Sequence, residues 1–281
     1  MNVGPLSPGL YVVATPIGNL GDITLRALEI LKQVDHVAAE DTRVSGQLLS
    51  TLGVRKPLLS VRAHNEQQGA ERLIEIILGG ESVAYVTDAG TPAISDPGSR
   101  LVEAVRDAGL AVLPIPGASA VIAALSVSGL SHGAWLFAGF LPPKAKARRD
   151  ALASLKSLTC ALVFYEAPHR VRETLADLTL VLGGNRRVFV ARELTKQFEE
   201  LATLSLAETA AWLDASEYHE KGEFVLVVEG AENEAPAMAE AGRIARVLAE
   251  ELPASQAARL ASKITGHKKS ELYALLMQKH E

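Results

Sequence analysis

Through its first half the sequence alternates short apolar runs with amphipathic segments, and this alternation restricts the fold more than any other feature. The amphipathic segments carry apolar residues at helical spacing, as at Leu25, Leu28 and Leu31. Strands that alternate with helices over short connections form a parallel sheet with helices on both faces. The chain is therefore predicted to be α/β. The runs expected to be strands lie at residues 10–14, 34–39, 58–61, 83–86 and 111–115.

The connection that follows the apolar run 83–86 is the most distinctive loop of the chain. It contains Gly90 and Gly98, which allow a ligand to approach the backbone, and two prolines, which restrict the shape of the loop. Open α/β sheets bind ligands at the carboxyl ends of their strands, where this loop lies. Two further loops, at 15–22 and 116–120, should open at the same edge. We therefore expect a ligand site here rather than an ordinary surface turn.

Several common kinds of site are not indicated by the sequence. None of these loops has the glycine spacing of a dinucleotide site or the lysine of a P-loop. The seven histidines are scattered without metal-ligand spacing, so no metal site is predicted. The one cysteine, Cys160, lies in an apolar run and is expected to be a buried small residue.

The composition is that of a soluble globular protein. Of the 281 residues, 48% are hydrophobic and 22% are charged. No apolar run is long enough to span a membrane and no signal peptide is evident, which predicts a cytoplasmic protein. The net charge is −5, yet residues 142–149 and 252–270 contain several basic and no acidic residues. Each basic island could face a phosphate backbone or be an ordinary solvated helix face.

The second half is expected to be α+β or mixed α/β and to end in a helical tail. Residues 231–237 are predicted to be a linker. The tail beyond them resembles a helix-turn-helix appendage, with Ser270 as the N-cap of its last helix, or else it is a packing clamp on the main body. The predicted domains are 9–130, 131–230 and 238–281. Strands are expected at 136–140, 159–165, 188–191 and 224–228, and helices from about 147 and at 171–182, 238–251, 254–265 and 270–280.

A series of motifs runs in order along the chain, at residues 10–22, 39–43, 88–98, 116–120, 139–142, 165–170, 192–196 and 221–224. In this order the motifs resemble the tetrapyrrole methylase superfamily and, within it, the branch that methylates small-subunit ribosomal RNA. The resemblance covers about residues 9–230, and the three-helix tail is also typical of that branch. One departure is Ala167, where serine is common in the family motif.

The resemblance implies an S-adenosylmethionine-dependent enzyme that methylates the ribose 2′-oxygen of a cytidine in small-subunit ribosomal RNA, free or within the 30S subunit. It also implies a homodimer and two α/β domains with the methyl donor in the cleft between them. The donor-binding residues that it implies are Pro16, Ile17, Asp88, Ala89, Gly90, Ile94, Ser119, Ala120, Tyr165 and Ala191.

Charge segregation, read together with this resemblance, predicts which residues contact the RNA. The candidates are basic residues of the two islands or of the ends of predicted strands in the second half. They are Lys144, Lys146, Arg148, Arg149, Arg170, Arg192, Lys196, Lys268 and Lys269.

Methyl transfer from a sulfonium is an in-line displacement with a neutral leaving group, so it requires no metal and no covalent nucleophile. The acceptor hydroxyl must lose its proton, and Asp41, Glu166 and His169 are the candidate bases at strand ends. Arg43 could orient the ribose or a phosphate. If Glu166 takes the proton, Glu166→Gln should abolish transfer and leave donor binding nearly intact. Each of the four could instead form a structural ion pair.

Two other functions are compatible with parts of the sequence. A tetrapyrrole C-methyltransferase would keep the fold and change the acceptor, but the basic islands and the helical tail favour RNA. A non-catalytic RNA-binding protein could carry a degenerate donor pocket, but the intact glycine- and proline-rich loops argue against such decay.

Overall fold

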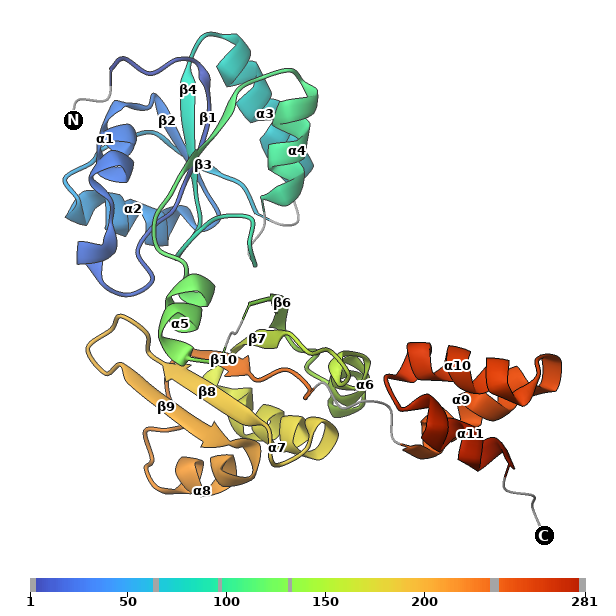
Figure 1. The fold of residues 1–281 in the computed structure, drawn as a ribbon. Helices are drawn as coiled ribbons and strands as arrows, with labels where there is room; N and C mark the ends of the chain where they lie inside the picture. The colour runs from blue at the N-terminus through green and yellow to red at the C-terminus, as the bar shows by residue number, and fades with distance from the viewer. Residues whose placement is uncertain (1–3, 63–65, 96–97, 131–132, 233–237, 278–281) are drawn as a thin grey trace. The chain divides into compact units, whose positions relative to one another are not determined.

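Both α/β halves of the chain belong to one compact unit, and the helical tail forms another. The computed structural model describes residues 4–62, 66–95, 98–130, 133–232 and 238–277. Contacts group residues 1–156 and 160–229 into the first unit, and residues 157–159 and 230–281 into the second. Figure 1 shows the sheets of the first unit and the three helices of the second. The division of the first unit at residue 130 stays a prediction. Asp96 and Pro97 of the central loop, and the predicted helix end at His280, lie outside the described residues.

The first sheet is parallel throughout, as the alternation of apolar runs and helices predicts. Its central strands are buried, because helices cover both faces of the sheet. The predicted positions of the strands are confirmed to within two residues. In spatial order the strands are β3 (Leu58–Ser60), β2 (His36–Ala39), β4 (Ser82–Val86), β1 (Gly9–Val13) and β5 (Val112–Ile115).

Alternate side chains of each strand enter two separate cores. Tyr11 and Val13 of β1 pack with one pair of helices, whereas Leu10 packs with the other pair. The first core contains α1 (Leu25–Gln33) and α2 (Thr42–Thr51), and the second contains α3 (Glu66–Leu78) and α4 (Ser99–Asp107).

The three loops expected at one edge of the sheet do meet there. Thr15 and Gly90 exchange backbone hydrogen bonds of 2.9 and 3.1 Å, which join the loops after β1 and β4. The Thr91 hydroxyl donates to the Ala118 carbonyl at 3.0 Å, which joins the loop after β4 to the loop after β5. Gly90 has a φ of 82°, a conformation that favours glycine. The sequence therefore predicted correctly that these three loops meet at one edge of the sheet, and a ligand site at that edge stays a prediction.

The second sheet is mixed, and this confirms the prediction that the second half of the chain is α+β or mixed α/β. The first pair of strands is parallel and the remaining neighbours are antiparallel. In spatial order the strands are β6 (Trp135–Phe140), β7 (Ala161–Glu166), β10 (Phe224–Val228), β8 (Arg187–Arg192) and β9 (Glu200–Ser205). The helices of this region are α6 (Ala145–Leu155), η3 (Pro168–Arg170), α7 (Val171–Leu182), η4 (Leu206–Glu208) and α8 (Thr209–Asp214).

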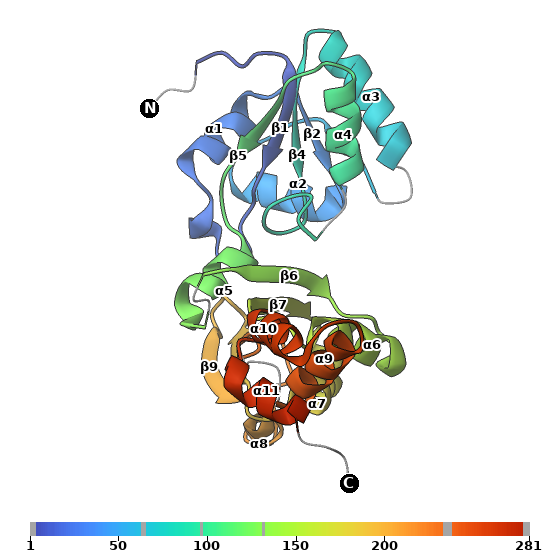
Figure 2. The same ribbon diagram turned by 45° about the vertical axis from the view of Figure 1, so that its right-hand side comes forward.

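Helix α5 (Ala120–Ser128) follows the first sheet in the chain but packs on the second. Val121, Ala124 and Leu125 lie in one core with side chains of β7, β8 and β10. Figures 1 and 2 both show α5 between the carboxyl edge of the first sheet and the second sheet. The helix is apolar over most of its surface, which suits an element with neighbours on several sides.

The tail has its own small core of alanines around Leu272. Its helices are α9 (Met238–Glu251), α10 (Ala254–Thr265) and α11 (Lys269–Met277). Gly266 ends α10 in the left-handed conformation. The prediction that Ser270 caps the last helix is wrong, because α11 begins at Lys269 and Ser270 lies inside it. In the part of the chain that the structure describes, no helix is long and apolar enough to cross a membrane.

Candidate functional site

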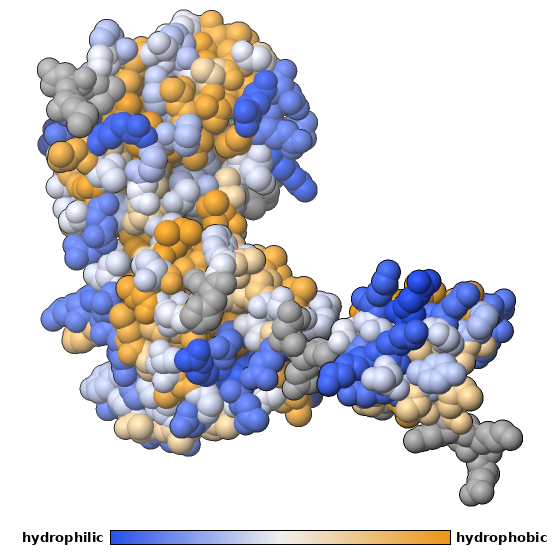
Figure 3. Space-filling model, viewed as in Figure 1, coloured by the Kyte–Doolittle hydropathy of each residue, from blue (hydrophilic) through white to orange (hydrophobic). Residues whose placement is uncertain are grey.

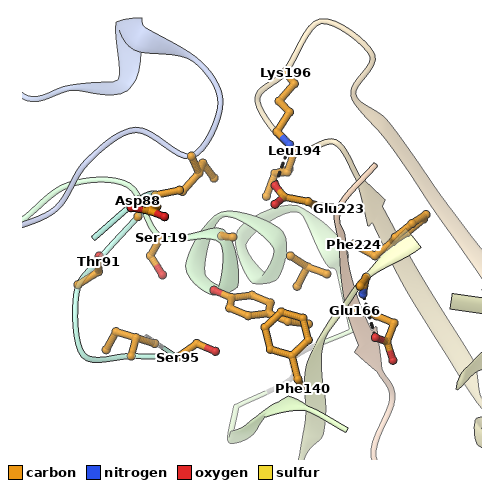
Figure 4. Close-up of a pocket in the computed structure, with 18 of the residues that line it drawn as sticks. Asp88, Thr91, Ser95, Ser119, Phe140, Glu166, Leu194, Lys196, Glu223 and Phe224 are labelled. Carbon is orange, nitrogen blue, oxygen red and sulfur yellow. Dashed lines mark hydrogen bonds and ion pairs between the residues drawn. The ribbon is translucent and has the colours of Figure 1, made fainter. Parts of the chain in front are cut away.

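A cavity of about 480 Å³ lies where the loops of the first sheet meet the second sheet (Figure 4). A volume of this size suits a small organic ligand. The first sheet contributes Ile17, Glu40, Asp88, Ala89, Gly90, Thr91, Ile94, Ser95, Ser119 and Ala120. The second contributes Phe140, Tyr165, Glu166, Ala167, Pro168, Leu194, Lys196, Glu223, Phe224 and Val225.

The wall formed by the first sheet consists mainly of backbone, small side chains and one exposed carboxylate. Asp88 follows β4, and its Oδ1 accepts a hydrogen bond from the Asp41 N–H at 3.4 Å. Gly90 lies close to Ile17, since a Cβ on Gly90 would stand 3.2 Å from the Ile17 Cγ2. Glycine at this position lets the loops after β4 and β1 approach closely, and its role toward a ligand stays a prediction.

The wall formed by the second sheet is aromatic at one end and charged at the other. The Tyr165 ring makes edge-to-face contacts with Phe137 and Phe140, at centroid distances of 4.9 and 5.6 Å. At the other end Lys196 Nζ lies 2.9 Å from Glu193 Oε1 and 2.7 Å from Glu223 Oε2. The cavity can therefore receive a ligand that has both a flat apolar part and polar or charged groups.

Lys196 and Glu193 are both expected to be charged at neutral pH. Burial lowers the pKa of Lys196, but the hydrogen bonds and charges of Glu223 and Glu193 outweigh it, so this pKa is raised. Burial raises the pKa of Glu193, and the bonds from Lys196 and the Glu223 backbone outweigh that effect, so this pKa is lowered. Both shifts favour the charged forms.

Most of the residues predicted to bind the donor lie together around the cavity. Pro16 and Ala191 are the exceptions among the predicted ten: both are buried and neither borders the cavity. Ala191 lies in the core between α5 and the second sheet. The role of the others in binding stays a prediction. Those that line the cavity are Ile17, Asp88, Ala89, Gly90, Ile94, Ser119, Ala120 and Tyr165.

The cavity also contains residues of the second sheet that were not predicted from the sequence to line it. Glu223 and Phe224 belong to the motif at 221–224, and Leu194 belongs to the motif at 192–196. Both motifs were recognised, but neither was assigned to the cavity. The signal was present in their charge and in their position at strand ends. The end of β8 and the start of β10 meet because the two strands are antiparallel neighbours. This pairing is not evident from the sequence, so the two motifs could not be placed at one site.

Glu166 does not have the environment of a proton acceptor. Its residue borders the cavity, but its carboxylate points away from it in Figure 4 and is fully buried. Oε1 accepts from the Ala167 N–H at 2.8 Å and lies 3.5 Å from Arg170 Nε. Oε2 accepts from the Thr174 hydroxyl at 2.5 Å. The carboxylate therefore holds the start of η3 and α7, which favours a structural role for Glu166, and its catalytic role stays a prediction.

The other three catalytic candidates lie outside the cavity wall. Asp41 is the N-cap of α2 and accepts from Arg43 Nη2 at 2.7 Å and from Nε at 3.1 Å. The hydrogen bonds from Arg43 hold the pKa of Asp41 well below its ordinary value. His169 is exposed in η3. Of the four predicted catalytic residues, only Glu166 borders the cavity, and its carboxylate points away from it.

The nine basic residues predicted to contact RNA differ in exposure: Arg148 and Arg192 are buried, Arg170 and Lys196 are half-buried, and the other five are exposed. An RNA contact is disfavoured for Arg148, whose side chain is 2% exposed and donates to Asp177 at 2.6 Å, and the role of Arg148 stays a prediction. Arg192 is also buried and donates to Glu200 at 3.0 Å. Arg170 donates to the Leu141 carbonyl at 2.6 Å. The N–H donors that these guanidinium groups use inside the protein are not available to a phosphate. The exposed residues are Lys144, Lys146, Arg149, Lys268 and Lys269.

The acidic, histidine and cysteine side chains do not gather into a metal site in the part of the chain that the structure describes. Within residues 4–277, apart from the undescribed segments, no group of three His, Cys, Asp or Glu side chains is placed to hold a metal ion.

Comparison with known families gives two matches that together span almost the whole chain. Residues 9–210 match the model of the tetrapyrrole (corrin/porphyrin) methylases. Residues 235–280 match the model described as the RsmI C-terminal HTH domain.

Curated relatives are similar over nearly their full length. A protein of Xylella fastidiosa named ribosomal RNA small subunit methyltransferase I is 51% identical over 95% of this chain and 98% of its own. A protein of Vibrio cholerae with the same name is 48% identical over 95% of this chain and 93% of its own.

Solved structures share the fold at much lower identity. The methyltransferase CobJ matches with a TM-score of 0.60 and 19% identity, over 80% of this chain and 95% of its own. A uroporphyrin-III C-methyl transferase from Thermus thermophilus, solved in complex with S-adenyl homocysteine, matches with a TM-score of 0.56 and 18% identity. That match covers 79% of this chain and 97% of the other.

Proposed function

The chain belongs to the tetrapyrrole methylase family, and from this premise we propose that it transfers a methyl group from S-adenosylmethionine to small-subunit ribosomal RNA. The observation that carries the proposal is the 51% identity to a small-subunit rRNA methyltransferase over 95% of the chain, together with the match of the tail. We propose the ribose 2′-oxygen of a cytidine as the acceptor atom, in the cytoplasm where ribosomal subunits occur.

The residues around the cavity fit the donor. S-adenosylmethionine has an aromatic base, a ribose and an amino acid group, and the cavity has an aromatic end and a polar end. At Gly90 the absence of a side chain leaves room beside Ile17. We propose that the loops after β1, β4 and β5 hold the donor from one side and Tyr165, Leu194 and Val225 from the other.

When bound, the donor supplies a methyl group on a positively charged sulfur. The acceptor oxygen attacks that carbon as the carbon–sulfur bond breaks, and the acceptor proton must leave. The protein aligns the reactants and excludes water, which can account for about 7–11 kcal/mol of the barrier in well-oriented reactions. With Glu166 turned away, Asp88 is an exposed carboxylate that borders the cavity and can accept the proton, whereas the Glu223 carboxylate is paired with Lys196.

A transfer assay tests this function. Wild-type protein, S-adenosylmethionine with a tritiated methyl group and small ribosomal subunits that lack the modification are expected to give labelled RNA. Nuclease digestion and chromatography should place the label on a 2′-O-methylated cytidine. Subunits that already carry the modification are the matched control and should take up no label. If RNA takes up no label but a tetrapyrrole supplied in a parallel reaction does, the proposal is contradicted and the C-methyltransferase alternative is favoured.

The exposed basic residues of α6 and its preceding loop should provide part of the RNA contact. Neutralising Lys144, Lys146 and Arg149 together is expected to weaken RNA binding and to lower the slope of log K against log salt. The slope should fall by about 0.7–0.9 for each phosphate that the protein no longer neutralises. Fluorescence anisotropy over a range of salt concentrations measures it. Neutralising the exposed Lys32, Arg55 and Arg106 removes the same charge elsewhere and should leave the slope nearly unchanged.

We also propose a homodimer, supported by apolar surface that this chain leaves open. Ile122 and Val127 of α5 are each 54% exposed, as is Phe140 at the end of the edge strand β6, where Trp135 is 43% exposed. Figure 3 shows apolar surface over this part of the first unit. An apolar surface of this kind on a soluble protein commonly marks a contact with another chain.

A further inference from the structure

The side chain of Lys196 joins three loops at the rim of the cavity. Its Nζ donates to Glu193 after β8 and to Glu223 before β10, at 2.9 and 2.7 Å. Its aliphatic stem crosses Gly18 in the loop after β1, because a Cβ added at Gly18 would overlap the Lys196 Cγ. The ammonium group of Lys196 therefore links two loops of the second sheet, while its aliphatic stem packs against the loop after β1.

The loop that carries Lys196 is held in an unusual backbone conformation. Glu193 and Thr195 have φ angles of 51° and 68°, which residues with side chains rarely adopt. The loop keeps this shape through a dense set of bonds: the Glu193 N–H donates to the Glu223 carbonyl, and the Glu223 N–H donates to Glu193 Oε1, both at 2.9 Å. Strained backbone that is fixed in this way is concentrated at functional sites.

Two observations argue against Lys196 as a contact for RNA. Its ammonium is already paired with two carboxylates, and its side chain is only 27% exposed. Figure 4 shows its head directed at Glu223, beside Leu194, over one end of the cavity. The two carboxylates occupy two of the three N–H donors of Lys196, and their negative charges would repel a phosphate.

We propose that Lys196 is a positioning residue that covers the donor cavity by holding the loops of the two sheets together. The inference rests on the proposed function, because it assumes that S-adenosylmethionine binds in this cavity. Without the lysine, the Glu193 and Glu223 carboxylates lose their shared partner. The loop after β1 also loses its contact with the lysine stem at Gly18, next to Ile17. Donor affinity should then fall, whereas RNA affinity should not.

A double-mutant cycle between Lys196 and Gly18 tests this contact by calorimetry with S-adenosylmethionine. Lys196→Ala is expected to weaken donor binding by about tenfold, as for the loss of one charge-assisted contact. Gly18→Ala should have a similar effect although the lysine is retained, because its Cβ displaces the stem. The two effects should be less than additive, since the double variant lacks the stem and retains only the backbone strain of alanine at a φ of 157°. Lys32→Ala, an exposed lysine of α1, is the matched control for donor affinity.

Each possible result decides between the roles of Lys196. The salt dependence of RNA binding should be the same for Lys196→Ala and wild type. If Lys196→Ala binds the donor normally but lowers the salt slope, Lys196 is an RNA contact and the inference is overturned. Additive effects of the two substitutions would also overturn it. If the wild-type protein itself does not bind S-adenosylmethionine, the proposed function fails and the inference fails with it. Thermal denaturation of each variant confirms that it is folded.

Discussion

Replacing Arg148 by methionine is expected to lower the free energy of unfolding by about 3–5 kcal/mol, the usual effect of removing one partner of a buried ion pair. Arg148 Nε donates to Asp177 Oδ2 at 2.6 Å, and Nη2 donates to Glu173 at 3.2 Å. The Asp177 side chain is 12% exposed, so without the arginine its charge has little access to water. Urea denaturation of the purified protein measures the change.

Two companion variants make the result specific. Lys146→Met changes an exposed residue of the same helix and should alter stability by less than about 0.5 kcal/mol. Arg148→Met combined with Asp177→Leu removes both charges and should recover much of the loss, because an apolar pair can replace a buried ion pair. If Arg148→Met is as stable as the wild type but binds RNA weakly, the predicted RNA contact is right and the structural assignment is wrong.

Replacing Glu166 by alanine is expected to lower the free energy of unfolding by about 3 kcal/mol. The substitution leaves the Ala167 N–H and the Thr174 hydroxyl without their acceptor in a buried place, and it removes the carboxylate beside Arg170. Glu166→Gln should cost less, about 1–2 kcal/mol, since the amide oxygen can still accept one of these bonds. Chemical denaturation measures both variants.

Methyl transfer by Glu166→Gln separates the structural role from the catalytic one. We expect a single-turnover rate within a few-fold of wild type at a temperature at which the variant is folded, because the carboxylate points away from the cavity. A variant with normal stability and donor affinity but no transfer would show that Glu166 takes the acceptor proton after all.

The first sheet could be predicted because its pattern is local. Parallel strands covered on both faces are apolar throughout, and the helices between them repeat at helical spacing. Outside the first sheet, helices α7 and α10 and strand β10 also have the bounds that the sequence predicts. The carboxyl ends of parallel strands must lie at one edge of their sheet, so the ligand edge followed from the same pattern.

Strand β9 and helix α8 were not predicted, and both depend on neighbours. Strand β9 is an edge strand with no fully buried residue, and it pairs with β8 from Arg187–Ser205 to Arg192–Glu200. Its mixed polar sequence does not differ from that of a loop. Helix α8 has six residues, too few for a periodic signal.

The direction in which each side chain of the site points could not be predicted from the sequence. Tyr165 and Glu166 are adjacent in β7 and therefore lie on opposite faces, one toward α5 and the cavity and the other toward α7. Arg148 and Arg149 are adjacent in α6, and only the packing of α6 on α7 decides that Arg148 is the buried one.

Local periodicity and the motifs were thus sufficient for the fold class, the family and the loops that the first sheet contributes to the cavity, since each motif and each loop is formed by residues close together in the chain. The tertiary structure decided which charged groups are free to meet a ligand. Lys196, Arg148 and Glu166 all have hydrogen-bond partners from other elements, at separations of up to 29 residues, and the stem of Lys196 lies against the still more distant Gly18. A charge that is paired inside the protein is no longer available to RNA or to a reacting hydroxyl, and that pairing is formed only when the chain folds.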